Sequence, residues 1–166
     1  MKKLKHLFIW GVVLFSTPLL AQAPANDNCS GSIVQPQNGT CLTGTTVNAT
    51  DSWSTTGGVG CQTANNSPDV WYSFTATGTV GSWTLTNITM TGNIEFVLVI
   101  PNCASNNCTC PFLLVNSTCG PSVLNVTINT LTVGQIYHYT ISSSTGSQGT
   151  FQTCLTVSNP PPAPGQ

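Results

Sequence analysis

Cysteines are the residues of this chain whose type and number most directly predict chemistry. The eight are Cys29, Cys41, Cys61, Cys103, Cys108, Cys110, Cys119 and Cys154. An even number of cysteines in an exported chain predicts disulfide bonds. The alternative is a zinc site around Cys108 and Cys110, which would need CxxC pairs or nearby histidines as further ligands. Beyond the N-terminal residues 1–23 the one histidine is His138, so we expect disulfides, no metal and no cofactor.

Groups that could carry out catalysis are scarce. A serine-hydrolase triad would have to use His138, no Gly-x-Ser-x-Gly motif is present, and strand alternation predicts a solvent-facing His138. A glycosidase needs two carboxylates across a cleft. Glu95 lies inside a very apolar strand, where we expect it at an edge or rim; an unpaired buried carboxylate there would have a raised pKa. We therefore expect no enzymatic activity. The four acids of the chain are Asp27, Asp51, Asp69 and Glu95.

The first 23 residues predict a signal peptide. Lys2, Lys3 and Lys5 precede an apolar run at 7–15 and a small-residue cleavage site within 21–23. The apolar run is too short to span a bilayer, so we expect a secreted or cell-surface protein without membrane insertion after signal removal. These lysines are all of the Lys and Arg in the chain, which leaves a side-chain charge of 0 − 4 = −4 after export. Because phosphate binding needs cationic side chains, nucleic-acid binding is excluded.

Aromatic and amide residues in and beside a long predicted loop, residues 51–68, suggest a carbohydrate site. Sugar-binding sandwiches stack sugars on exposed aromatic rings, with amides and carboxylates around them, and tryptophan is well suited to this. Against this, Trp71 can equally pack against the second sheet or a loop, while Asp69 just before it reads as a turn or cap residue. The candidate ligand-binding residues are Trp53, Trp71, Asn65, Asn66 and Asp51.

The elements that must position these residues are all predicted to be strands. In the segment 69–78, Val70, Tyr72 and Phe74 alternate with polar residues, which is typical of a strand that covers a core. We place one domain at 24–158, with a bulge near Asn87, and a Pro-rich tail or linker at 159–166. About nine short strands without a helical period predict an all-β, disulfide-bonded β-sandwich or jelly roll. The other strands are expected at 32–34, 42–50, 82–90, 94–100, 112–115, 123–128, 136–141 and 150–157.

Five segments carry a resemblance to a known family: 26–29 (NDNC), 44–50 (GTTVNAT), 69–74 (DVWYSF), 131–137 (LTVGQIY) and the closing strand from Gly149 that contains Cys154. With these segments the chain resembles secreted bacterial β-sandwich modules related to pre-peptidase C-terminal domains, which are common in large adhesin-like surface proteins. The resemblance implies a non-catalytic module for adhesion to, or binding of, glycan or surface protein. Some of these modules carry acids after the Cys119 position that could hold calcium, but the residues following Cys119 here include none.

Several disulfide pairings are compatible with the predicted order of strands and loops. A Cys29–Cys154 bond would tie the start of the domain to its last strand. A Cys41–Cys61 bond would close the long predicted loop (51–68), and a Cys103–Cys119 bond would close the cysteine-rich loop expected at 102–110. Cys108 and Cys110 are left over, and a bond between cysteines two residues apart is sterically awkward. The alternative to glycan or protein binding is self-association into extracellular fibres, because the sheet edges lack the lysines that usually discourage strand pairing between molecules.

Overall fold

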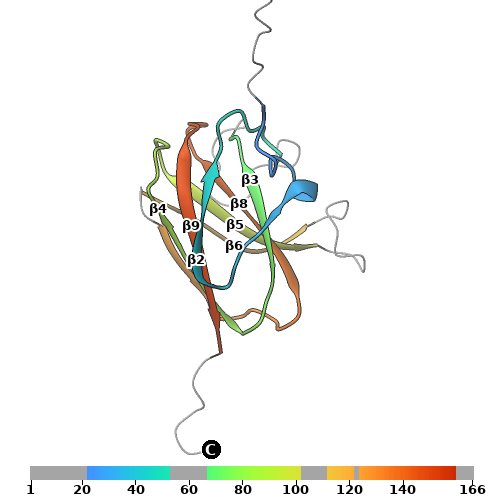
Figure 1. The fold of residues 1–166 in the computed structure, drawn as a ribbon. Helices are drawn as coiled ribbons and strands as arrows, with labels where there is room; N and C mark the ends of the chain where they lie inside the picture. Colours follow the sequence, from blue (N-terminus) through green and yellow to red (C-terminus); the bar gives the residue numbers. More distant parts are fainter. Residues whose placement is uncertain (1–21, 53–66, 102–111, 122–123, 160–166) are drawn as a thin grey trace, which may run out of the picture.

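The computed structural model describes residues 22–52, 67–101, 112–121 and 124–159. Within these residues the chain forms two β-sheets that pack face to face, which confirms the predicted all-β sandwich (Figure 1). One 3₁₀ turn, η1 (Cys29–Gly31), precedes the strands. The strands are β1 (Ile33–Val34), β2 (Asn38–Thr45), β3 (Val70–Thr75), β4 (Val80–Thr86), β5 (Ile94–Pro101), β6 (Phe112–Gly120), β7 (Leu124–Ile128), β8 (Ile136–Ser143) and β9 (Thr150–Ser158).

Each sheet has a simple order. The five-stranded sheet runs β1-β3-β8-β5-β6, and the four-stranded sheet runs β2-β9-β4-β7. All neighbouring strands are antiparallel except β1 and β3, which are parallel. The described chain begins at one end of the sandwich, and β9 leaves it at the opposite end (Figure 1).

Aromatic rings from both sheets fill the space between them. The ring of Tyr139 stacks on the rings of Tyr72 and Phe96, with ring centroids 5.1 Å and 5.3 Å apart. All three residues belong to the five-stranded sheet. Trp83 reaches across from β4 and meets Phe96 at 5.3 Å and Phe74 at 5.5 Å. Such pairs contribute roughly 0.5–1.5 kcal/mol each beyond the area they bury. The alternation that predicted β3 therefore identified the inner face of its sheet correctly.

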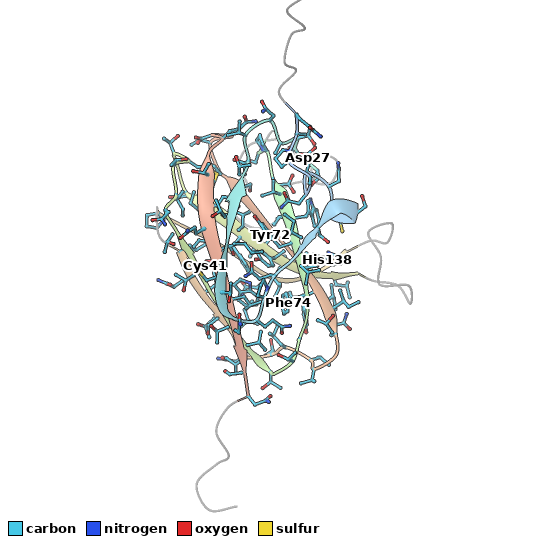
Figure 2. All side chains as sticks on the ribbon, viewed as in Figure 1. Asp27, Cys41, Tyr72, Phe74 and His138 are labelled. Carbon is cyan, nitrogen blue, oxygen red and sulfur yellow. A yellow bond between two sulfur atoms is a disulfide. The ribbon has the colours of Figure 1, made fainter. Side chains whose placement is uncertain are left out.

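The outer face of the five-stranded sheet is buried as well. Trp71, Val97 and Val99 point away from the aromatic core, yet each is at most 2% exposed. They form a second cluster with Cys29 of η1, because the N-terminal segment (22–34) crosses this face. Figure 2 places Tyr72 and Phe74 between Cys41 on one side and His138 on the other.

Some strand limits differ from the sequence-based expectation. The second strand was expected at 42–50, but β2 spans 38–45 because a turn with Asn48 at φ 62° follows it. The bulge expected near Asn87 is wrong: β4 ends at Thr86, and Asn87 adopts φ 52° in the following turn. The strand expected at 112–115 continues to Gly120 because β6 pairs with β5 along its whole length.

The described disulfide contradicts two expected pairings. Cys41 of β2 lies directly opposite Cys154 of β9, and the two are bonded with a Cα–Cα distance of 4.1 Å. The Cys29–Cys154 and Cys41–Cys61 pairings are therefore wrong, because sheet register brought Cys41 and Cys154 together where loop closure had been assumed. All cysteines that the structure describes, Cys29 and Cys119 included, are disulfide-bonded. Outside the described residues lie Cys61, Cys103, Cys108 and Cys110, so the Cys103–Cys119 pairing stays a prediction.

Replacing both Cys41 and Cys154 by alanine should lower the free energy of unfolding by about 2–4 kcal/mol, since the bond joins residues 113 positions apart. Chemical denaturation of the exported chain under non-reducing conditions measures the change. Peptide mapping of the oxidised protein provides the control: the bond assigned here is refuted if Cys41 is recovered linked to any cysteine other than Cys154.

Candidate functional site

Trp71 is a packing residue and not an exposed platform for sugars. Its side chain is 2% exposed, and its indole Nε1 donates a hydrogen bond to Ser52 Oγ at 2.7 Å. Its backbone N–H donates to the Asn26 carbonyl at 2.8 Å, and its carbonyl accepts from Asn26 Nδ2 at 3.0 Å. The packing alternative is therefore confirmed for Trp71. The other candidates Trp53, Asn65 and Asn66 lie outside the described residues.

Two buried carboxylates hold the segment 50–52 in place beside Trp71. Asp69 accepts hydrogen bonds from the Ser52 N–H at 2.8 Å and from Ser52 Oγ at 2.6 Å. Asp27 does the same for Thr50, with 2.5 Å to the N–H and 3.0 Å to Oγ1. Each carboxylate thus accepts a backbone and a hydroxyl hydrogen bond, which is the turn-stabilising role expected of Asp69.

Burial makes ionisation of the Asp69 side chain unfavourable. Burial raises the pKa of Asp69 from 3.8 to about 7, the hydrogen bonds from Ser52 act in the opposite direction, and the charges of Asp51 and Asp27 add to the rise. Asp51, the fifth ligand candidate, is half-buried and lies in this group. No lysine or arginine follows residue 5, so the buried carboxylates receive hydrogen bonds from hydroxyl and backbone amide groups and not from cationic side chains.

His138 is buried, which contradicts the solvent-facing position expected from strand alternation. It is 5% exposed, its Nδ1 lies 3.6 Å from Cys29 Sγ, and its ring meets Trp71 edge-on at 6.5 Å. Alternation placed its side chain on the correct face of β8, but that face is covered by the N-terminal segment (Figure 2). Burial lowers the pKa of the imidazole, so the ring is neutral at pH 7.

Glu95 is also buried, in contrast to the expected edge or rim position. It is 2% exposed, and its Oε2 accepts a hydrogen bond from Ser142 Oγ at 2.9 Å. The reason is the position of β5 between β8 and β6, which the sequence order does not reveal. Across the described ranges, no group of three or more His, Cys, Asp or Glu side chains is arranged to hold a metal ion.

The outward face of the four-stranded sheet is an open polar surface that the sequence analysis did not single out. Sheet register aligns its side chains into rows, such as Thr43–Gln152–Thr86 and Thr156–Ser82–Thr127, with the Cys41–Cys154 bond between them. These side chains are exposed or half-buried, and none is charged or aromatic. The available signal was the repeated alternation of hydroxyl and apolar residues. We call this surface the hydroxyl face; it consists of Thr43, Thr45, Ser82, Thr84, Thr86, Asn125, Thr127, Thr150, Gln152 and Thr156.

Comparison with known proteins supports the fold. No family model matches the chain, and no curated protein is similar in sequence. Among solved structures, the fold is similar to that of a surface-associated copper-binding protein important in copper acquisition by Methylomicrobium album BG8. The match has a TM-score of 0.51 at 9% identity and covers 76% of this chain and 98% of that chain. The described residues include no helix that is long and apolar enough to cross a membrane.

The raised pKa of Asp69 predicts a stability that falls as pH rises. The folded state holds a proton on Asp69 up to about pH 7, whereas the unfolded chain releases it near 3.8. Between these values the free energy of unfolding should therefore decrease with pH, by roughly 2–4 kcal/mol in total. Denaturant titrations at pH 5 and pH 8 measure this loss.

The substitution Asp69→Asn should flatten the pH dependence, because the amide does not titrate. Asp51→Asn is the matched control and should keep most of it, since burial of Asp69 outweighs the charge of Asp51 in raising the pKa. Equal slopes for the wild type and Asp69→Asn would assign the effect to another group.

Proposed function

We propose that this chain is a secreted, non-catalytic module that binds uncharged glycan through the hydroxyl face. The observation that carries the proposal is the composition of that face: aligned hydroxyls and amides on all four strands of the sheet, without a charged or aromatic side chain. Hydroxyl groups both donate and accept hydrogen bonds, as do the hydroxyls of a sugar polymer. An exposed sheet face suits an extended polymer better than a small molecule, which usually takes a concave pocket.

The chemistry of the face favours glycan over protein as the partner. Protein interfaces are anchored by aromatic residues, methionine and arginine, which supply most of the binding energy. The hydroxyl face contains none of these residue types. Acidic polymers are disfavoured because the exported chain carries only negative side chains. An uncharged, hydroxyl-rich polysaccharide meets neither objection. Because the face has no aromatic ring on which a sugar could stack, such a polymer would be held by hydrogen bonds alone.

Several features support an extracellular, non-catalytic role. Disulfides such as Cys41–Cys154 persist in oxidising compartments, consistent with the predicted signal peptide. Asp27 and Asp69 are occupied in fixing the segment 50–52, and His138 is enclosed beneath the N-terminal segment. These groups are thus used in holding the fold, as the predicted adhesin-like module requires. The copper binding of the structural neighbour is not carried over to this chain, because at 9% identity the likeness concerns the fold.

Binding by such a face should be weak at each contact and strong only in sum. A hydrogen bond formed in exchange for water contributes about 0.5–1.5 kcal/mol, so one sugar unit is held poorly. A polymer that contacts several rows at once, or many copies of the module, gains by avidity. This behaviour suits adhesion to an insoluble polysaccharide and disfavours the capture of free sugars.

The double substitution Thr84→Val and Thr156→Val tests the proposal, because it removes two hydroxyls of the face and preserves side-chain shape. Depletion of the exported chain from solution by suspended cellulose, chitin or β-1,3-glucan should weaken roughly tenfold for the polymer that the wild type binds, given about 0.5–1.5 kcal/mol per hydrogen bond. The matched control is Thr91→Val with Thr132→Val, two exposed threonines away from the face, and should bind as the wild type does. Wild-type protein that binds no uncharged polysaccharide, or face and control variants that bind equally, would refute the hydroxyl face as a glycan site.

A further inference from the structure

Strand β2 is an edge of the four-stranded sheet with an open backbone. It pairs with β9 on one side only. Its first residues are occupied locally: the Thr40 carbonyl accepts from Gln35 Nε2 at 3.1 Å, and the Thr40 N–H donates to Asn38 Oδ1 at 3.1 Å. The remaining part, 41–45, follows the irregularity in the ladder and runs in regular register with β9.

The disulfide shows which backbone groups of β2 point outward. In antiparallel pairs the Cα atoms of residues that share no hydrogen bond lie about 4.5 Å apart, against about 5.5 Å for hydrogen-bonded residues. Cys41 and Cys154 are 4.1 Å apart, so they form a pair of the first kind. By alternation Thr43 and Thr45 belong to the same class, and the N–H and C=O groups of all three residues point away from β9. Among the described residues, none makes a backbone hydrogen bond to these groups.

Nothing in the sequence of β2 discourages pairing with another strand. Natural edge strands are protected by lysines, inward charges, prolines or bulges. The segment 38–45 (NGTCLTGT) has no lysine, charge or proline, and its one irregularity lies between Asn38 and Cys41, before the regular part 41–45. The carboxylates Asp27 and Asp69 lie with the segment 50–52 and the start of β3, on the other sheet. The Cys41–Cys154 bond also holds the edge in one register, so it is ordered before a partner arrives.

We propose that β2 pairs with β2 of a second copy of this chain, antiparallel and centred on Thr43. In this register Thr43 faces its own counterpart, and Cys41 faces Thr45 of the other copy. Each facing pair exchanges two hydrogen bonds, so the outward groups of the three residues are all satisfied, with about six bonds in total. The edge is self-complementary because the outward residues are evenly placed about Thr43.

The side chains at this edge fit the same partner. Leu42 and Gly44 point towards the core side, and both are half-buried in the single chain. In the antiparallel pair Leu42 faces Gly44 of the other copy, which leaves room for the leucine. The apolar strand β1 lies on the same flank, joined to β2 by residues 35–37, and its Ile33 and Val34 are 38% and 73% exposed. A second copy on this flank would remove apolar surface from water.

The pairing has a consequence for the proposed glycan site, and this step rests on that proposed function. Antiparallel strands in one sheet are related by a two-fold axis perpendicular to the sheet. The two four-stranded sheets therefore become one continuous sheet, with both hydroxyl faces on the same side. The dimer presents twice the area to a polymer surface, which raises avidity without a new type of contact.

Substitution of Thr43, which faces its own counterpart across the axis, gives a direct test. Sedimentation equilibrium of the exported chain at concentrations up to about 1 mM should detect a wild-type dimer, the range in which weak association is measurable. Thr43→Lys and Thr43→Glu each place like charges opposite one another and should raise the dimer dissociation constant about tenfold. An equimolar mixture of the two variants should restore association as a heterodimer. Thr156→Lys, which adds the same charge on the inner strand β9, should leave the wild-type dimer intact.

A monomeric wild type over this range would overturn the proposal, as would a Thr43→Lys variant that dimerises like the wild type. Circular dichroism checks separately that both variants fold. If the folded Lys and Glu variants do not associate when mixed, the proposal is also overturned. Depletion by polysaccharide is measured independently on the same samples. A dimer that binds no glycan refutes the proposed function alone, and glycan binding by a monomer refutes the β2 pairing alone.

Discussion

The pairing of β9 with both β2 and β4 is the interaction on which the rest of this structure depends. β9 closes the chain, yet it lies inside the four-stranded sheet and joins segments far apart in sequence. Its inward residues Phe151 and Leu155 meet the aromatic core, and its outward residues align the rows of the hydroxyl face. The bond from Cys154 to Cys41 fixes this register covalently. Both surfaces to which we assign a role therefore follow from one strand.

The absence of lysine and arginine after residue 5 is the second constraint. A carboxylate that leaves water needs hydrogen-bond donors, and here the donors are backbone N–H groups and hydroxyls of serine and threonine. Asp27 and Asp69 each take one of both kinds, and Glu95 takes the hydroxyl of Ser142. The same residue types cover the exposed sheet. The same residue types therefore have two roles: they donate hydrogen bonds to the buried acids, and they keep the surface polar without cations.

Sequence alone predicted the sandwich and the inner face of its strands, because alternation of apolar and polar residues reports directly which side of a strand meets a core. It failed where a second layer lies over the sheet. His138 was placed on the correct, outward side of its strand, but the N-terminal segment buries that side. Glu95 was expected at an edge or rim, but β5 lies between β8 and β6. The Cys41–Cys154 bond was missed for a related reason. Cysteine pairing depends on which strands are neighbours, and this topology is not written in local periodicity.

The ends of the described chain lie at opposite ends of the sandwich, and this has a mechanical consequence. A pull between the two ends acts along the strands, so the hydrogen bonds between β9 and its neighbours are loaded in shear and must fail together. β9 has such a ladder on each side, and one of them is reinforced by a covalent bond that tension cannot unzip. A domain built in this way resists extension most strongly along the line that joins the two ends of the described chain.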